Sequence, residues 1–180
     1  MEPHDPFDEL VDHVDSRDAV IEVVTRRRMR ADRLRHRAVF IAIRHTDGRL
    51  LVHRRSMEKD IWPGWCDIAV GGVVSSGESY DQAARRELAE EIGIDVVPMA
   101  IDGGISRAYD DDSVSLFGRC YTVVHEGPFR FADGEVSEAW WSTGAELRAL
   151  RGDEDFLPDS LALLWPLLDL DGWGDSHPVA

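Results

Sequence analysis

The sequence predicts a layered domain of the α/β class. Its 180 residues are enough to bury one hydrophobic core without support from disulfides or a structural metal. Apolar runs typical of strands lie on both sides of one amphipathic stretch, residues 79–92, whose apolar side chains recur at helical spacing. Strands and helices that are mixed along a chain of this length pack as layers around a common core.

The N-terminal part is expected to form an arm ahead of the first long apolar run. We expect a flexible tail over residues 1–6, a single domain over residues 7–180, and the arm over residues 7–37. Within the arm, turn-forming residues separate two short apolar runs, and Thr25 is suited to cap a short basic helix. The elements predicted there are strands at 9–14 and 19–24 and a helix at 25–33.

The middle of the chain is expected to hold three strands and the clearest helix. A continuous apolar run predicts a buried strand, and the turn signal at residues 46–48 leads into the next one. Ser79 has the side chain of an N-cap, and Gly93 is suited to end the helix. The predicted strands cover residues 38–43, 50–52 and 67–74, and the helix covers residues 79–92.

The C-terminal half is expected to add strands and then two helices. Apolar runs of strand length recur there, and the last part of the chain returns to helical spacing. The strands are predicted at 96–101, 114–124 and 135–141, and the helices at 144–150 and 159–168.

Composition narrows the classes of function. Twenty Lys and Arg residues against 35 Asp and Glu residues give a net charge of −15, which disfavours general binding to nucleic acids. The longest apolar run, near residues 161–170, is too short to span a membrane. The N-terminus lacks the pattern of a signal peptide, so we expect a cytoplasmic protein in which Cys66 and Cys120 are reduced thiols. The arginine-rich segment 26–37 is suited either to a small anionic ligand or to a solvated helix face.

Three glutamates on the predicted central helix form a candidate metal site. Glu87, Glu90 and Glu91 stand at positions i, i+3 and i+4, so their side chains project from one face and repel one another. A divalent cation among them removes this conflict, and oxygen ligands without His or Cys nearby favour Mg²⁺ or Mn²⁺. Arg86 is placed to neutralise and orient nearby carboxylates such as Glu78. For the three glutamates alone, an exposed helix of mixed charge is the commoner explanation.

The wider pattern favours the metal site. Residues 72–94 read GVVSSGESYDQAARRELAEEIGI and match Gly-x5-Glu-x7-Arg-Glu-U-x-Glu-Glu-x-Gly-U, where U is aliphatic, at every specified position. This pattern is the Nudix box, and the chain resembles the Nudix hydrolase superfamily. The resemblance implies an α/β/α sandwich with a mixed β-sheet, in which the box forms a loop, a helix and a second loop.

The resemblance also implies an activity and a role for each residue of the box. Nudix hydrolases usually cleave a nucleoside diphosphate linked to another group, a small-molecule substrate, by attack of water on phosphorus. The bound cations neutralise the diphosphate, position the water and lower its pKa. Glu78 and Arg86 are expected to support the loop and the helix. The expected metal ligands are the backbone carbonyl of a glycine and three carboxylates, from Gly72, Glu87, Glu90 and Glu91.

The general base is left open, because this family takes it from different places. Glu91 is expected to act as ligand or as base, with Glu90 beside it in the catalytic cluster. Downstream, Glu135 and Glu138 cannot share one face of a regular strand, since successive side chains alternate. We expect Glu138 to be the one that approaches the metal site.

Two other functions compete with hydrolysis. Residues 39–78 resemble the segment that leads into the box of isopentenyl-diphosphate isomerases, which transfer protons with a Cys followed by Gly-His-Pro. The matching residues 71–74 read Gly-Gly-Val-Val, and Cys66 lies five residues too early, so the isomerase acid and base are missing. The likeness therefore indicates a hydrolase from a branch near the isomerases. The other alternative is a nucleotide sensor without activity, although a sensor does not need the full set of glutamates. Homodimers are common in the superfamily, and no feature of the sequence decides this point.

Overall fold

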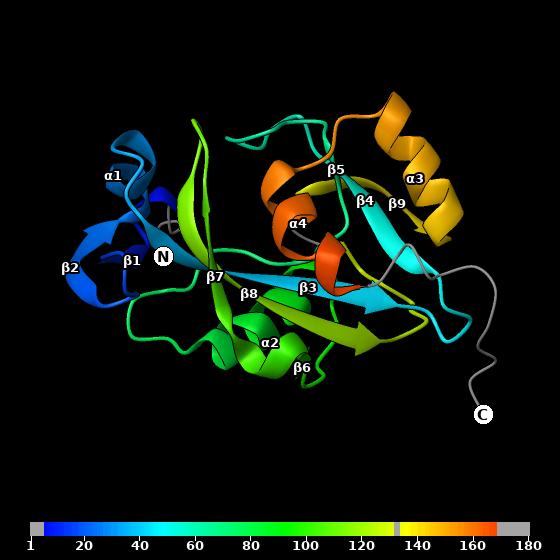
Figure 1. Ribbon diagram of the computed structural model, residues 1–180, viewed down its shortest axis with the longest axis horizontal. Helices are drawn as coiled ribbons and strands as arrows, with labels where there is room; N and C mark the ends of the chain where they lie inside the picture. The colour runs from blue at the N-terminus through cyan, green and yellow to red at the C-terminus, as the bar shows by residue number, and fades with distance from the viewer. Residues whose placement is uncertain (1–5, 132–133, 169–180) are drawn as a thin grey trace.

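The computed structural model describes residues 6–131 and 134–168 and has a mixed β-sheet between two layers of helices (Figure 1). The sheet is formed by β3 (His36–Arg44), β4 (Leu50–Arg55), β5 (Cys66–Asp67), β6 (Met99–Ala100), β7 (Ser106–Asp110), β8 (Ser115–Val124) and β9 (Val136–Ser142). Its central order is β5-β4-β3-β8-β6, with β7 also paired to β8 and β9 to β4. The central strands β3 and β8 are parallel, whereas β4 is antiparallel to its neighbours.

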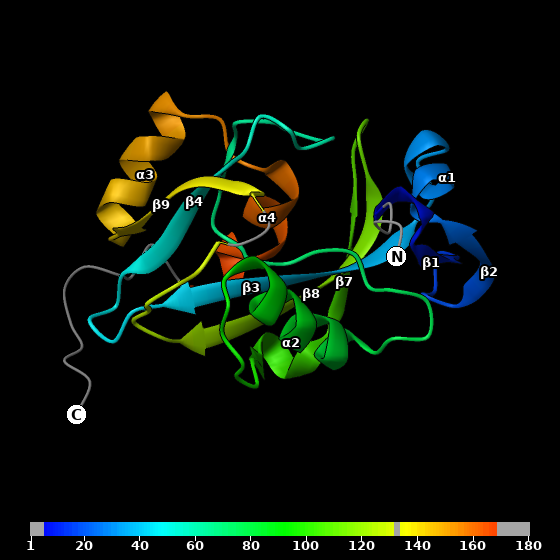
Figure 2. The ribbon, with the colours of Figure 1, turned by 180° about the vertical axis from the view of Figure 1, so that it is seen from behind.

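The long strand β3 explains why helices cover both faces of the sheet. Its even-numbered side chains over residues 38–42 pack in one core cluster with α3 (Gly144–Asp153) and α4 (Pro158–Leu163). Its odd-numbered side chains over residues 39–43 pack in another cluster with α2 (Tyr80–Glu91). Figure 2 shows α2 on the opposite side of β3 from α4. Because side chains alternate along a strand, one fully apolar run serves two layers, and the predicted α/β/α sandwich is confirmed.

The N-terminal arm packs beside the loop that precedes α2. It consists of η1 (Pro6–Asp8), β1 (Leu10–Val14), β2 (Val20–Thr25) and α1 (Arg26–Ala31). The hydroxyl of Thr25 accepts a hydrogen bond from the backbone N–H of Arg28, so the predicted N-cap of α1 is confirmed. A small core joins the arm to the loop, formed by Val11, Val24, Met29 and Val73. Of the predicted tail, residues 1–5 lie outside the described residues, and so do residues 169–180.

Two predicted strands are much shorter in the structure. Instead of residues 67–74, only β5 forms, and Val70 and Val73 then make single bridges to β3. Gly71, with φ +157°, interrupts the pairing between them. Instead of residues 96–101, only β6 forms before the turn η2 (Ile101–Gly104), and the apolar side chains around it are exposed. Each of these apolar runs therefore forms a strand over only two residues, and the predicted strand lengths are wrong.

One strand was not predicted. The segment SRAYD forms β7 and pairs along β8 from Ser106 opposite Arg119 to Asp110 opposite Ser115. No residue of β7 is buried, so the segment carries no apolar alternation that a sequence pattern can detect.

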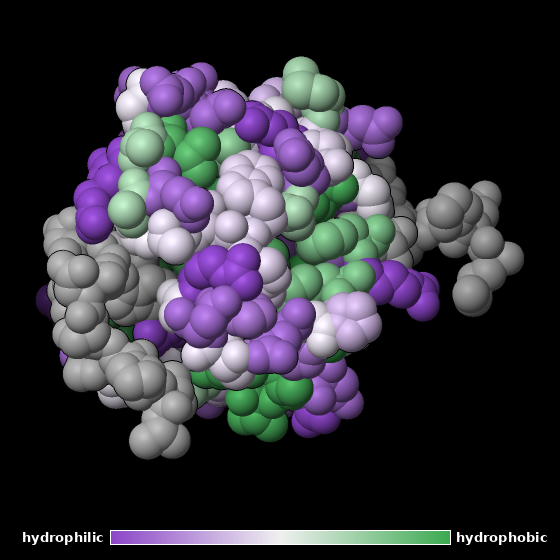
Figure 3. All heavy atoms as spheres, turned by 90° about the vertical axis from the view of Figure 1, so that its right-hand side faces the viewer, coloured by the Kyte–Doolittle hydropathy of each residue, from purple (hydrophilic) through white to green (hydrophobic). Residues whose placement is uncertain are grey.

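The helices agree more closely with the sequence. A capping box between Ser79 and Gln82 begins α2, and Gly93 follows its end with φ +73°. The predicted last helix is divided into α4 and η3 (Trp165–Leu167), because Pro166 supplies no backbone N–H to continue it. Among the described residues, every helix is too short or too polar to cross a membrane. The side of the molecule that faces the viewer in Figure 3 interleaves hydrophilic and hydrophobic side chains.

Candidate functional site

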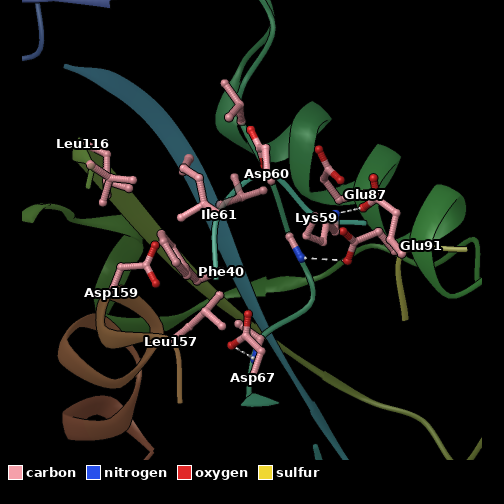
Figure 4. A pocket seen from close by; sticks show the side chains of 18 of the residues that line it. Phe40, Lys59, Asp60, Ile61, Asp67, Glu87, Glu91, Leu116, Leu157 and Asp159 are labelled. Atoms are coloured by element: carbon pink, nitrogen blue, oxygen red, sulfur yellow. Dashed lines mark hydrogen bonds and ion pairs between the residues drawn. The ribbon is translucent and has the colours of Figure 1, made fainter. Parts of the chain in front are cut away.

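A cavity of about 630 Å³ lies between α2 and α4, over β3 (Figure 4). Glu87 and Glu91 of α2 line one end and Asp159 lines the other, while Asp67 lines the cavity lower in the view. The segment that follows β4 also lines the cavity, where Lys59 lies near the glutamates. The volume is within the usual range for small-molecule sites, which is about 300–1,000 Å³.

Helix α2 divides the three predicted glutamates between the cavity and the solvent. Glu87 and Glu91 are one helical turn apart on the buried face, and they are 8% and 9% exposed. Glu90 lies on the edge of that face, and its side chain is 59% exposed. The structure therefore brings two of the carboxylates together at the end of the cavity and leaves the third at its rim.

Two glycines let the loop before α2 approach these carboxylates. The backbone N–H of Gly71 donates to Oε2 of Glu91 at 3.2 Å. A Cβ on Gly71 would lie 2.0 Å from the carbonyl oxygen of Val39, and one on Gly72 would lie 2.5 Å from Oε1 of Glu87. The carbonyl of Gly72 accepts a hydrogen bond from Val39 at 2.9 Å, and its second lone pair remains as a donor for a cation.

Arg86 ties the loop to the helix. Its Nε and Nη2 donate to both oxygens of Glu78 at 3.0 Å, and Nη2 also reaches the carbonyl of Val73 at 3.1 Å. Its Nη1 lies 2.8 Å from Oε1 of Glu87 and 3.1 Å from Oε2 of Glu90. The expected contact between Arg86 and Glu78 is present. Arg86 also forms an ion pair with the carboxylate of Glu90, four residues later on the helix.

The electrostatics of the α2 end favour an added positive charge. Burial raises the pKa of Glu87, and the charge of Glu90 adds to this effect while Arg86 opposes it. Burial also raises the pKa of Glu91 well above its usual value, and the charge of Glu87 raises it further. Two buried carboxylates are therefore incompletely balanced by one arginine.

The donor set fits a hard divalent cation, since it consists of carboxylate and carbonyl oxygens alone. As the side chains are placed, no three His, Cys, Asp or Glu residues within the described ranges converge closely enough to hold an ion. Glu90 instead forms an ion pair with Arg86, and Glu91 accepts from the Gly71 N–H. Glu87, Glu91 and the Gly72 carbonyl nevertheless meet at one end of the cavity.

Basic side chains line the cavity near these acids. Arg26 lies 3.3 Å from Glu9, Arg30 lies 3.4 Å from Asp60, and Lys59 forms an ion pair with Glu135. Other arginines of the predicted basic segment 26–37 instead form ion pairs with carboxylates outside the cavity, as Arg33 and Arg35 do with Asp110. Arg26 and Arg30 of the segment therefore line the cavity, and binding of an anionic ligand by the segment stays a prediction.

The structure places Glu135, and not Glu138, in the cavity lining with Glu87 and Glu91. Glu138 stands opposite Arg54 in the pairing of β9 with β4, is exposed, and lies 3.8 Å from Nε of that arginine. It does not line the cavity, whereas Glu135 does. Contrary to the expectation, Glu138 therefore lies outside the cavity lining, and the glutamate that lines the cavity precedes β9.

A family model described as the NUDIX domain matches residues 34–161, which is most of the chain. The chain belongs to the Nudix family. It is accordingly a hydrolase of the pyrophosphatase type.

Relatives of this Nudix chain span nearly its whole length. An uncharacterized Nudix hydrolase of Yersinia pestis is 43% identical over 156 residues, covering 87% of this chain and 84% of the relative. Nudix hydrolase YfcD of Escherichia coli K12 is 42% identical over 156 residues, with 87% and 84% covered. Among solved structures, DR0079 of Deinococcus radiodurans matches with a TM-score of 0.71 and 30% identity, covering 88% of this chain and 99% of that one. The NUDIX domain of NrtR from Shewanella oneidensis, crystallised with ADP ribose, has a TM-score of 0.56 at 21% identity, with 72% and 83% covered, and shares the fold.

Sequence reasoning missed the far end of the cavity in this Nudix domain. Asp67 and Asp159 come from β5 and from the start of α4, and neither belongs to a motif. Their meeting depends on packing between distant segments, so no local signal predicts it. Cys66, beside Asp67, is fully buried and is not part of the cavity lining, and burial raises the pKa of its thiol. The site thus offers no reactive thiol of the isomerase kind.

Proposed function

We propose that this Nudix hydrolase cleaves a diphosphate linkage in a nucleoside diphosphate derivative, with Mg²⁺ or Mn²⁺ as its cofactor. The observation that carries the proposal is that two buried carboxylates of α2 and several basic side chains line one cavity. A diphosphate needs both, because the carboxylates hold a cation and the basic groups bind phosphate oxygens. The residues that would hold the cation are Gly72, Glu87, Glu90 and Glu91.

We assign separate roles in the reaction to the residues that line the cavity. A cation held by these residues would neutralise charge on the diphosphate and lower the pKa of the attacking water. Arg26 and Arg30, which line the cavity, bind phosphate oxygens. The Gly71 N–H holds the carboxylate of Glu91 in place.

We assign proton transfer to a carboxylate that lines the cavity. Glu91 serves as ligand or base, and its raised pKa brings a base closer to the working pH. Glu135 replaces Glu138 as the second candidate base, because it lines the cavity and contacts Lys59 there.

A panel of nucleoside diphosphate derivatives tests the proposal. Each compound is incubated with the protein and Mg²⁺, and released phosphate is measured after coupling to a phosphatase. ADP-ribose, the ligand named for the NrtR domain, belongs in the panel. We expect hydrolysis that stops in excess EDTA and returns with Mg²⁺ or Mn²⁺. Full activity in EDTA, double-bond migration in an isoprenoid diphosphate, or binding without turnover of any member would overturn it.

The remaining expectations concern the state of the protein in the cell. We propose a cytoplasmic protein that acts on a small molecule rather than on nucleic acid, since its net charge is −15. A homodimer stays a prediction of the family resemblance, and sedimentation equilibrium tests it.

A further inference from the structure

Two further buried carboxylates line the cavity away from α2. Asp67 ends β5 and Asp159 opens α4, and they are 5% and 6% exposed. Both line the cavity. Figure 4 shows the carboxylate of Asp159 extending from α4 toward Phe40 and Ile61, across the cavity from the glutamates of α2. This end of the cavity therefore combines apolar walls with two deeply buried acids.

Asp159 has an oxygen that the protein does not use. Its Oδ1 accepts a hydrogen bond at 2.8 Å from the backbone N–H of Ser160, and its other oxygen receives none from a described residue. Oδ1 of Asp67 accepts from the backbone N–H of Ala69 at 2.9 Å. Among the described residues, neither carboxylate forms an ion pair with a basic side chain. Hydrogen bonds from Ser160 and from the backbone of Ile68 also reach Asp67, so Asp159 is the acid of the two with the fewer donors from the protein. A buried acceptor with few donors is unfavourable, so its free oxygen is suited to a donor supplied by a ligand.

The charges around the pair agree with this interpretation. Burial raises the pKa of Asp67 to about 6 and that of Asp159 to about 7, and the charge of Asp67 adds to the effect on Asp159. Arg55 lowers both values, yet its Nε is itself buried without a hydrogen-bond partner in the described chain. A polar group that lacks a partner in the described chain, the Arg55 Nε, therefore also lies at this end.

The apolar walls give the shape of the missing group. Phe40 on β3, Leu116 on β8 and Leu157 before α4 line the same space as Asp159. Ile61 and Trp62 line it from the segment after β4. A flat ring packs well between aromatic and aliphatic side chains, with its polar edge turned to the carboxylates.

We propose that this end of the cavity binds the heterocyclic base of the substrate, and that Asp159, together with Asp67, accepts hydrogen bonds from two adjacent N–H donors on the edge of that base. Guanine presents such an edge, with a ring N–H beside an exocyclic amino group. Adenine and uracil each present a single donor on the corresponding edge. The inference rests on the proposed function, since it assigns the diphosphate to the α2 end of the same cavity.

Calorimetric titration with nucleoside monophosphates tests the inference without catalysis. The full-length protein in EDTA is titrated with GMP, IMP, AMP and UMP. IMP is the matched probe, because it differs from GMP only by the missing amino group. We expect GMP to bind at least about tenfold more tightly than IMP, and AMP and UMP to bind no better than IMP. Neopterin shares the edge of guanine, and the tighter of GMP and neopterin identifies a nucleotide or a pterin as the source of the ring.

Isosteric variants assign the preference to the two aspartates. Asp159→Asn keeps the acceptor for Ser160 and adds donors that face those of the base, so we expect GMP affinity to fall to that of IMP. Asp67→Asn is the second variant, and it is expected to lower GMP affinity severalfold. Asp155→Asn is the control, because Asp155 is an exposed aspartate four residues before Asp159 and lies outside the cavity lining. Melting temperatures of all three confirm that they are folded.

Each result decides one of the two proposals. Equal binding of GMP, IMP and AMP by the unaltered protein overturns the inference, and so does a GMP preference that survives in both folded variants. If the diphosphate panel is hydrolysed with Mg²⁺ and no base preference is found, the inference alone is wrong. If GMP preference is found and depends on Asp159 while no member is hydrolysed, the proposed function alone is wrong.

Discussion

The two ends of the cavity bury carboxylates in different ways. At the α2 end, Glu87 lies 2.8 Å from the guanidinium of Arg86, and Glu91 accepts from the Gly71 N–H, all within one short stretch of sequence. At the α4 end, Asp67 and Asp159 come from distant segments, and no basic side chain of the described chain forms an ion pair with them. At the α2 end, one sequence motif therefore supplies both the acids and the groups that partly neutralise them. At the α4 end, we infer that the ligand supplies hydrogen-bond donors to the acids.

The largest expected effect is on turnover at the α2 end. We expect Glu91→Gln to lower kcat by at least about 100-fold, because charge stabilisation of this kind contributes a few kcal/mol. Its melting temperature in EDTA should stay equal or rise, since a buried charge is removed. Glu90→Gln should lower kcat by a similar factor without gaining stability, because it loses its contact with Arg86. Steady-state kinetics and calorimetry measure both properties, and near-normal turnover of both variants would contradict the site.

The two glycines of the loop should separate folding from metal binding. A Cβ on Gly72 meets only the end of the Glu87 side chain, so Gly72→Ala should fold and weaken Mg²⁺ activation by about tenfold. A Cβ on Gly71 meets the backbone of Val39, and its φ of +157° is unfavourable for other residues. Gly71→Ala should therefore lower the free energy of unfolding by about 3 kcal/mol. Mg²⁺ titrations and urea unfolding distinguish the two outcomes; equal effects of both variants would refute the distinction.

A smaller effect is expected from the glutamates of and beside β9. We expect Glu135→Gln to lower kcat about tenfold, because Glu135 lines the cavity and contacts Lys59. Glu138→Gln is the matched control, since its side chain lies outside the cavity lining, and it should change kcat less than twofold. The reverse order would restore Glu138 as the base.

The smallest effect is a pH dependence of stability that both ends share. Burial raises the pKa of Asp159 to about 7 and raises those of Glu87 and Glu91, so the folded protein holds protons that the unfolded chain releases. Stability in EDTA should therefore fall as pH rises from 6.5 to 8.5. His36 and His53, whose pKa values burial lowers to about 3, oppose this trend only below about pH 6.5.

Calorimetry at three pH values measures this slope. Asp159→Asn and Glu91→Gln should each flatten it, because each variant removes one of the groups that titrate in the window. Mg²⁺ should flatten it for the unaltered protein and for Asp159→Asn, since the cation stabilises the ionised glutamates. A melting temperature that rises between pH 6.5 and 8.5 in EDTA would contradict the raised pKa values.

Features that depend on neighbouring residues were predicted from the sequence, whereas features that depend on contacts between distant segments were not. The start and end of α2 were predicted because Ser79 and Gly93 act through neighbouring backbone groups. Alternation along the strand separated Glu135 from Glu138, but which of the two reaches the cavity depends on the pairing with β4, which the local sequence does not show. The inner aspartates were missed for the same reason, since their environment exists only after α4 packs on the sheet.

The parallel pairing of β3 with β8 has a consequence for folding kinetics. Ile41 pairs with Tyr121, and the whole box lies in the chain between them. Bringing such distant strands together requires closure of a long loop before its contacts contribute, which slows folding relative to helical proteins. The loop before α2 is attached to β3 through Val39 and Gly72, so the catalytic end takes shape only with the central sheet. A newly made chain therefore carries its complete box well before it carries a working site.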